Sequence, residues 1–366
     1  MPECSVEGYH IRISVTDLEA IQGIIREHEI FCAPVPDFDL YNSLTWRRQA
    51  AHHGTQIYAL FDRNVLSDVL HLVRPAGSQI SQDCGERERI GAALMAFLQC
   101  SNIIIEPNIA LYENPSLARE ELRLFRRADD VDAGIYTDIA LRRRHSIPTT
   151  GLPERVTPIP DVDFHIAIKG RRNLTVATLK IAEVELSELP PVQKMERFLY
   201  WSFSEFLFLA GPLQVAVVHF SPHRECTVLK NLRSPDRQRA LRALRNAVWD
   251  LQVIYQWIAC VTRQREENRF WLLCSRDRAL QHIARSVFCC DEGLCAAESN
   301  LQKLFEINWG RKDGSRLAEL AITLIGKADD IRRTANQNTS NAYPDELLAQ
   351  LEQDILAWRP RDLATE

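Results

Sequence analysis

The sequence lacks the features that define several large classes of protein. It contains no internal repeat and no low-complexity tract, which excludes solenoid and disordered architectures. It also lacks a surplus of positive charge, because its net charge is −5 and its isoelectric point is near 6.1. Binding of nucleic acid through bulk electrostatics is therefore not expected. Lysine is scarce, at seven of the 44 basic residues, and arginine supplies the rest, a bias that a GC-rich genome explains by itself.

Signals for secretion and for common enzyme classes are also missing. Residues 1–7 lack the basic start and apolar core of a secretory signal, and the ten cysteines include no C-x-x-C pair. These absences predict a cytoplasmic protein without disulfides or a zinc knuckle. The sequence has no G-x-S-x-G elbow and no Walker A loop, which argues against serine-nucleophile and P-loop chemistry.

The longest apolar stretch, residues 198–220, reaches the length that a bilayer requires. Glu205 near its middle would cost about 2.5–3.5 kcal/mol at the bilayer centre. Gly211 and Pro212 divide the stretch into a helix-like half and a β-rich half at residues 213–218. The pattern predicts a buried helix followed by a buried strand, and no contact with a membrane.

The elements alternate in the way that an α/β fold requires. Residues 57–61 and 270–274 are continuous apolar runs bounded by polar residues, typical of strands buried on both faces of a parallel sheet. Residues 86–99 and 235–264 carry apolar side chains at three- and four-residue steps, which predicts amphipathic helices.

Each of the two predicted buried strands is followed by an aspartate, Asp62 in one case and Asp277 in the other. In a parallel sheet the carboxyl ends of the strands share one edge, so these acids can converge. Clustered carboxylates repel one another unless a cation neutralises them, and their oxygen atoms suit Mg²⁺ or Mn²⁺. The pattern predicts a metal, although each aspartate taken singly also suits the N-cap of a helix.

The residues around both aspartates resemble the motifs of PIN-domain nucleases. Residues 59–66, ALFDRNVL, are similar to the opening motif, and residues 273–280, LCSRDRAL, are similar to the closing motif. The resemblance covers residues 55–125 and 236–290. It implies two further acids on helices, for which Glu113 and Asp250 are the candidates. Glu106 competes with Glu113, which is preferred because it is predicted to lie inside a helix.

The resemblance also implies a fold: a three-layer α/β/α core with a mostly parallel central sheet. The expected organisation is an N-terminal extension at 1–54, core segments at 55–125 and 236–295, a mainly helical insertion at 126–235 with a proline-rich connector at 145–163, and a helical C-terminal extension at 296–366.

The function that the resemblance implies is that of a metal-dependent endonuclease, acting on single-stranded or structured RNA ahead of DNA, with a role as a toxin or defence effector. Mg²⁺ or Mn²⁺ would activate water for phosphodiester hydrolysis. The implied residues are the metal ligands Asp62, Glu113, Asp250 and Asp277, the orienting residues Asn64 and Ser275, and the phosphate contacts Arg63, Arg276, Arg278 and Arg242.

Two alternatives remain open. The chain is either a catalytically inactive PIN-like module that docks a protein partner or a second copy of itself, or another Mg²⁺-dependent phosphoryl hydrolase. No D-x-D-x-T-like stretch follows either strand, which disfavours the second alternative. A Mn²⁺-dependent rise in melting temperature would separate a convergent metal site from the inactive module.

Overall fold

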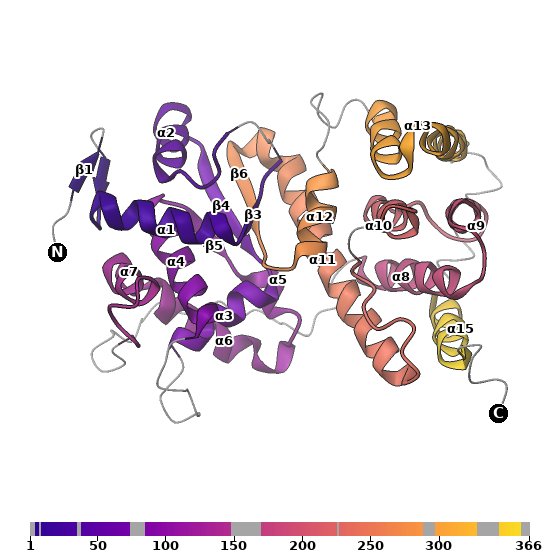
Figure 1. Cartoon of the computed structure of the whole chain (residues 1–366), viewed down its shortest axis with the longest axis horizontal. Helices are drawn as coiled ribbons and strands as arrows, with labels where there is room; N and C mark the ends of the chain where they lie inside the picture. Colours follow the sequence, from indigo (N-terminus) through magenta and orange to yellow (C-terminus); the bar gives the residue numbers. More distant parts are fainter. Residues whose placement is uncertain are drawn as a thin grey trace. The chain divides into compact units, whose positions relative to one another are not determined.

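The computed structural model describes residues 4–6, 9–34, 38–73, 85–147, 170–224, 227–287, 297–327 and 344–359. It divides the chain into two compact units (Figure 1). The α/β unit comprises Met1–Ile166 and Gln256–Asp277, and the helical unit comprises Ala167–Tyr255 and Arg278–Glu366. The N-terminal segment and residues 126–166 of the predicted insertion belong to the α/β unit, whereas the C-terminal segment and residues 167–235 belong to the helical unit.

A four-stranded mixed sheet forms the centre of the α/β unit, in the order β3-β6-β4-β5. Its strands are β3 (Phe31–Cys32), β4 (Gln56–Phe61), β5 (Ile104–Glu106) and β6 (Arg269–Cys274). Strand β4 runs parallel to both β5 and β6, whereas β3 runs antiparallel to β6. The two predicted buried strands are confirmed as β4 and β6. A separate antiparallel pair joins β1 (Cys4–Val6) and β2 (Tyr9–Ile11).

Seven helices of the described residues lie wholly in the α/β unit: α1 (Val15–Glu27), α2 (Ser43–His53), α3 (Arg63–Val73), α4 (Glu86–Cys100), α5 (Asn108–Leu111), α6 (Pro115–Asp129) and α7 (Ala133–Ala140). Local capping explains several helix starts, since Ser14, Asn42 and Asp132 each accept a backbone N–H of the first turn. The predicted amphipathic helix at 86–99 is confirmed as α4.

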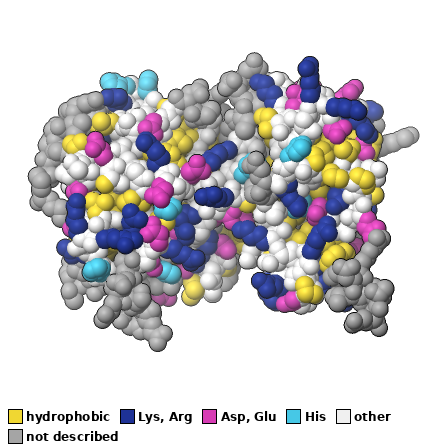
Figure 2. Space-filling view, viewed as in Figure 1, with side chains coloured by type: hydrophobic (Ala, Val, Ile, Leu, Met, Phe, Trp, Pro, Cys, Tyr) yellow, Lys and Arg dark blue, Asp and Glu magenta, His cyan; other side chains and the backbone are white. Residues whose placement is uncertain are grey.

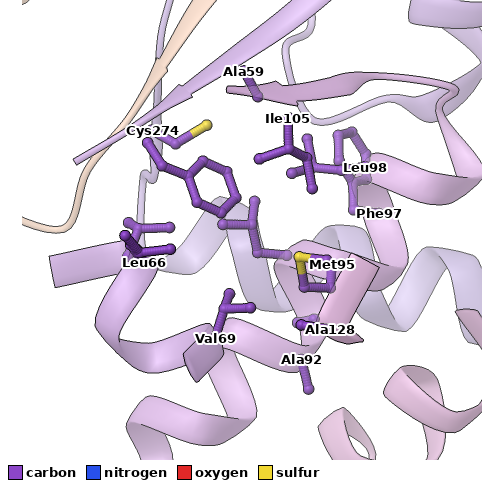
Figure 3. Close-up of a cluster of buried hydrophobic side chains, with 14 of the residues drawn as sticks. Ala59, Leu66, Val69, Ala92, Met95, Phe97, Leu98, Ile105, Ala128 and Cys274 are labelled. Carbon is purple, nitrogen blue, oxygen red and sulfur yellow. The ribbon is translucent and has the colours of Figure 1, made fainter. Parts of the chain in front are cut away.

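The core of this unit lies between the sheet and helices α3 and α4. Figure 3 shows Ala59, Ile105 and Cys274 of the strands facing Leu66 and Met95 of the helices, all of them buried. The opposite face of the sheet is covered too: β4 and β6 bury side chains on both faces. This two-sided burial explains why both strands are continuous apolar runs in the sequence.

Helices α3 and α4 approach closely at Gly91. A Cβ atom there would lie 3.2 Å from the carbonyl carbon of Asp68 and 3.3 Å from its Cβ. We expect Gly91→Ala to lower the free energy of unfolding by about 1–3 kcal/mol, because the helices must separate. Urea denaturation measures this effect.

Gly23 provides the matched control, because it also lies within a helix, α1, but has nothing within 4 Å of the added Cβ. Gly23→Ala should raise the free energy of unfolding by about 0.5–1 kcal/mol through helix propensity alone. Equal effects of the two substitutions would show that the contact at Gly91 does not limit helix packing.

The helical unit contains α8 (Arg171–Leu186), α9 (Pro191–Ser204), α10 (Ala210–Phe220), α12 (Arg278–Val287), α13 (Ala297–Gly326) and α15 (Pro344–Ala357). Helix α11 (Arg237–Glu267) begins in this unit, and its last residues, from Gln256, belong to the α/β unit. Trp257 in this last part donates its indole N–H to the carbonyl of Trp271 in β6, at 3.1 Å. The predicted proline-rich connector lies outside the described residues from residue 148 onward.

The predicted strand at 213–218 is wrong, because these residues lie inside α10. Pro212 occupies the first turn of this helix, where its missing N–H costs no hydrogen bond. The side chain of Trp309 donates to the carbonyl of Val217 at 2.9 Å and fixes α10 against α13.

Within the part of the chain that the structure describes, no helix combines the length and apolar character needed to cross a bilayer. Figure 2 shows basic and acidic side chains interspersed on the visible face, in keeping with a net charge of only −5. The visible surface therefore offers no single continuous basic face for a polyanion, and any such contact must be local.

Candidate functional site

The two motif loops lie side by side at the carboxyl ends of β4 and β6. Phe61 and Cys274 are register partners, so the residues that follow them leave the sheet at the same level. The backbone N–H of Asp62 donates to the carbonyl of Cys274 at 3.0 Å, which continues the ladder by one residue. The parallel sheet thereby joins residues 213 positions apart in the sequence.

Asp62 accepts hydrogen bonds on both carboxylate oxygens. Its Oδ1 accepts from the backbone N–H of Arg63 at 2.6 Å, and its Oδ2 accepts from Asn64 Nδ2 at 2.5 Å and from Ser275 Oγ at 2.7 Å. Asn64 also accepts the backbone N–H of Arg276 on its Oδ1 at 3.0 Å. Asn64 and Ser275 therefore orient Asp62 and fasten one motif loop to the other.

The electrostatics of Asp62 reflect both its burial and a second acid. Burial raises the pKa of the Asp62 carboxyl, and the charge of Asp277 raises it further, whereas hydrogen bonds from Ser275 and Arg63 act in the opposite direction. Asp277 is held by its backbone N–H, which donates to Ser275 Oγ at 3.0 Å. A cation bound beside these two carboxylates would relieve their repulsion.

Glu113 does not lie inside a helix, so the expectation that selected it over Glu106 is wrong. It lies in the turn between α5 and α6, and its charge contributes to the raised pKa of Arg63, of which the Glu121 hydrogen bond is the main cause. Glu106 ends β5 opposite Leu60, and burial raises the pKa of its carboxyl. Strand β5 therefore brings another acid to the edge where β4 ends.

Asp250 lies on α11 in the part that belongs to the helical unit, whereas Asp62, Glu113 and Asp277 belong to the α/β unit. Among the residues described, no three His, Cys, Asp or Glu side chains are arranged to hold a metal ion. Of the four predicted ligands, the structure joins Asp62 and Asp277 electrostatically and through Ser275.

The arginines next to the motifs bind buried carboxylates. Arg63 places Nη1 and Nη2 at 2.6 and 2.7 Å from the two oxygens of Glu121 on α6. Arg276 places Nε at 2.5 Å and Nη2 at 3.0 Å from the carboxylate of Asp68 on α3. Burial raises the pKa of Asp68 to about 6 despite this pairing. Arg63 and Arg276, two of the predicted phosphate contacts, fix the two loops through these ion pairs.

The other two predicted phosphate contacts, Arg278 and Arg242, are exposed. Arg278 is the first residue of α12, directly after Asp277, and Arg242 lies on α11. Both belong to the helical unit. Their guanidinium groups therefore lie at the surface, whereas those of Arg63 and Arg276 are committed to buried acids.

Sequence reasoning missed the roles of Asp68 and Glu121. Both are buried acids, and the signal that marks them is their position within an apolar helix stripe. Glu121, for example, is three residues after Ala118 and four residues before Phe125, both buried. An acid on the apolar face of a helix predicts a buried basic partner, because an unpaired charge there is costly.

No family model, no curated protein and no solved structure matches this chain. A functional assignment therefore depends on the residues themselves. The features that bear on it are the bonded set of Asp62, Asn64 and Ser275, the neighbouring charge of Asp277, and the buried ion pairs that hold both loops.

Proposed function

We propose that the α/β unit is a metal-dependent endoribonuclease that hydrolyses phosphodiester bonds, with a role as a toxin or defence effector. The observation that carries the proposal is the 2.7 Å hydrogen bond from Ser275 to Asp62. It joins the two sequence motifs that resemble those of PIN-domain nucleases. The preference for RNA over DNA follows from that resemblance.

We propose Mg²⁺ or Mn²⁺ as the ion at the sheet edge, because carboxylate oxygens are the ligands that these ions prefer. A carboxylate has about four lone-pair sites, and the hydrogen bonds to Arg63, Asn64 and Ser275 use three of those on Asp62. Asp62 and Asp277 would hold the ion, with Glu113 as the further ligand in the same unit that the resemblance implies. When bound, such an ion lowers the pKa of a water molecule and neutralises charge on the scissile phosphate.

The chain's own residues prepare this edge for a cation. Asn64 and Ser275 hold the Asp62 carboxylate in one orientation, and their hydrogen bonds favour its charged form against the effect of burial. The Arg63–Glu121 and Arg276–Asp68 pairs keep the two loops in place. A phosphate contact would then come from an exposed arginine, for which we propose Arg278, directly after Asp277 in the chain.

Replacement of both motif acids tests the activity. We expect the wild-type chain to cleave single-stranded RNA with Mn²⁺, and the Asp62→Asn, Asp277→Asn double variant to lose that cleavage. Single-stranded DNA of the same sequence tests the preference for RNA. EDTA should abolish any cleavage of either substrate by the wild-type chain. Unchanged cleavage in the double variant would contradict the assignment.

A metal titration separates the nuclease from an inactive module. Mn²⁺ should raise the melting temperature of the wild-type chain, since an ion that binds only the folded state stabilises it. The double variant should show no rise. Absence of a rise in the wild type would favour the interaction module over the enzyme.

A further inference from the structure

One buried carboxylate in the helical unit is surrounded by more basic groups than it can neutralise. Glu185 lies in the last turn of α8, and its Oε2 is 3.0 Å from Lys194 Nζ of α9. Its Oε1 is 3.7 Å from Arg224 Nη1 and 3.4 Å from Arg233 Nη2. Three cations therefore converge on a single acid.

His219 of α10 completes this group without adding charge. Its Nε2 lies 3.9 Å from Glu185 Oε2, and its Nδ1 lies 2.8 Å from Thr227 Oγ1. Burial lowers the pKa of His219 to about 4, and the charges of Arg224, Lys194 and Arg233 lower it too, whereas Glu185 opposes them. At pH 7 the imidazole is neutral, so these residues together carry two positive charges in excess.

The half-buried Arg63 and the buried Glu121 balance one for one. Arg63 and Glu121 meet through two hydrogen bonds of 2.6 and 2.7 Å, a closed pair in which each charge has its partner. The contacts of Arg224 and Arg233 with Glu185 are longer and use one terminal nitrogen each. Arg224 Nη1 also donates to the carbonyl of His219 at 3.2 Å, and Arg233 Nη2 to the carbonyl of Glu185 at 3.4 Å. A guanidinium carries five N–H donors, and all of these contacts use a single terminal nitrogen of each arginine.

The positions of the two arginines make the excess charge accessible. The side chain of Arg233 is 64% exposed and that of Arg224 is 37% exposed, whereas Glu185 and Lys194 are buried behind them. Like charges held this close repel one another, and an anion placed between the two guanidinium groups would remove that repulsion. The fork of donors on arginine matches both carboxylate and phosphate in shape, and phosphate carries the larger charge.

We propose that Arg224 and Arg233, supported by Lys194 and Glu185, form a binding site for the phosphate group of a small ligand such as a nucleoside monophosphate. A phosphate monoester carries close to two negative charges at neutral pH, which equals the excess at this site. The site lies wholly in the helical unit, so it is independent of the nuclease proposed for the α/β unit.

Calorimetric titration of the full chain tests this site. The probes are inorganic phosphate, AMP and adenosine, with ionic strength matched by sodium chloride. We expect saturable binding of phosphate and of AMP, and none of adenosine. Tighter binding of AMP than of phosphate would identify a nucleotide as the ligand type, and equal binding would identify the phosphate group alone. Absence of saturable phosphate binding would overturn the proposal.

Two matched variants show whether the binding is local. Arg233→Gln should weaken phosphate binding at least about tenfold, as expected for loss of a hydrogen bond to a charged group. Arg316→Gln is the control, because its side chain is also 64% exposed and pairs one for one with Glu196 in the same unit. It should change the affinity less than about twofold. Equal weakening in both variants would reveal an unspecific charge effect and overturn the proposal.

The imidazole of His219 provides a second measurement of binding that is independent of calorimetry. Bound phosphate should raise the pKa of His219 in an NMR titration, because an added negative charge nearby favours the imidazolium form. Arg233→Gln should lose most of this change, whereas Arg316→Gln should retain it. An unchanged His219 titration at saturating phosphate would place the ligand elsewhere and overturn the site.

Discussion

Asp62→Asn is expected to slow RNA cleavage about 10²–10³-fold, the usual cost of removing one preorganised electrostatic group from an active site. The asparagine side chain has nearly the shape of aspartate, but it removes the negative charge that a cation would need. The substitution also replaces one acceptor oxygen of the side chain with an N–H donor. The other oxygen remains an acceptor, and both Asn64 and Ser275 donate to a single oxygen of Asp62, Oδ2. Single-turnover rates with Mn²⁺ measure the effect.

Asp68→Asn is the control for this substitution. Asp62 and Asp68 belong to the same unit and are each 4% exposed, but Asp68 contacts the side chain of Arg276 rather than the proposed metal position. The loop that carries Arg276 is also held by Asn64 and Ser275, so cleavage should fall by no more than about tenfold. Equal losses in the two variants would mean that any buried carboxylate of this unit matters as much as Asp62.

Arg63→Ala is expected to lower the free energy of unfolding by about 3–5 kcal/mol, because it removes the cation that is paired with a buried carboxylate. Glu121 is 2% exposed and receives two hydrogen bonds from Arg63. With Arg63 gone, the Glu121 carboxylate loses both of these hydrogen bonds in a buried position. Chemical denaturation of the full chain, followed by circular dichroism, measures the loss.

Two controls distinguish burial from charge pairing as such. Arg26 and Asp39 form an ion pair of similar length, 2.7 Å, but both side chains are exposed, so Arg26→Ala should cost at most about 1 kcal/mol. Joint replacement of Arg63 by Met and Glu121 by Leu should recover most of the stability, because no unpaired charge remains. Similar losses in Arg63→Ala and Arg26→Ala would contradict the role assigned to burial.

The fold could be predicted where the hydrophobic pattern of a segment fits only one kind of secondary structure. Strands β4 and β6 are short apolar runs bounded by polar residues, and the structure places both in the sheet. Residues 213–218 are equally apolar, but a run that is hydrophobic on every side fits a buried helix as well as a strand. Strand β3 has two residues and carries no periodicity from which to predict it.

The part of the site that could be predicted is the part formed by the carboxyl ends of adjacent parallel strands, because these ends share one edge of the sheet. Asp62 and Ser275 follow adjacent parallel strands, and this is why the structure brings them into contact. The partners of Arg63 and Arg276 come from α6 and α3, and no spacing in the sequence encodes those tertiary contacts. The unit boundary falls inside α11, between Tyr255 and Gln256, where no proline or glycine interrupts the helix.

The position of β6 has a consequence for how the chain is made. This strand lies between β3 and β4, yet the ribosome synthesises it long after both of them, once the segment Ala167–Tyr255 of the other unit is complete. Until then β3 and β4 lack the strand that pairs with both of them. Ser275 and Asp277 arrive with β6, so a nascent chain that ends before them contains only the first half of the proposed catalytic edge. Synthesis of β6 and of the loop that follows it therefore completes the proposed catalytic edge.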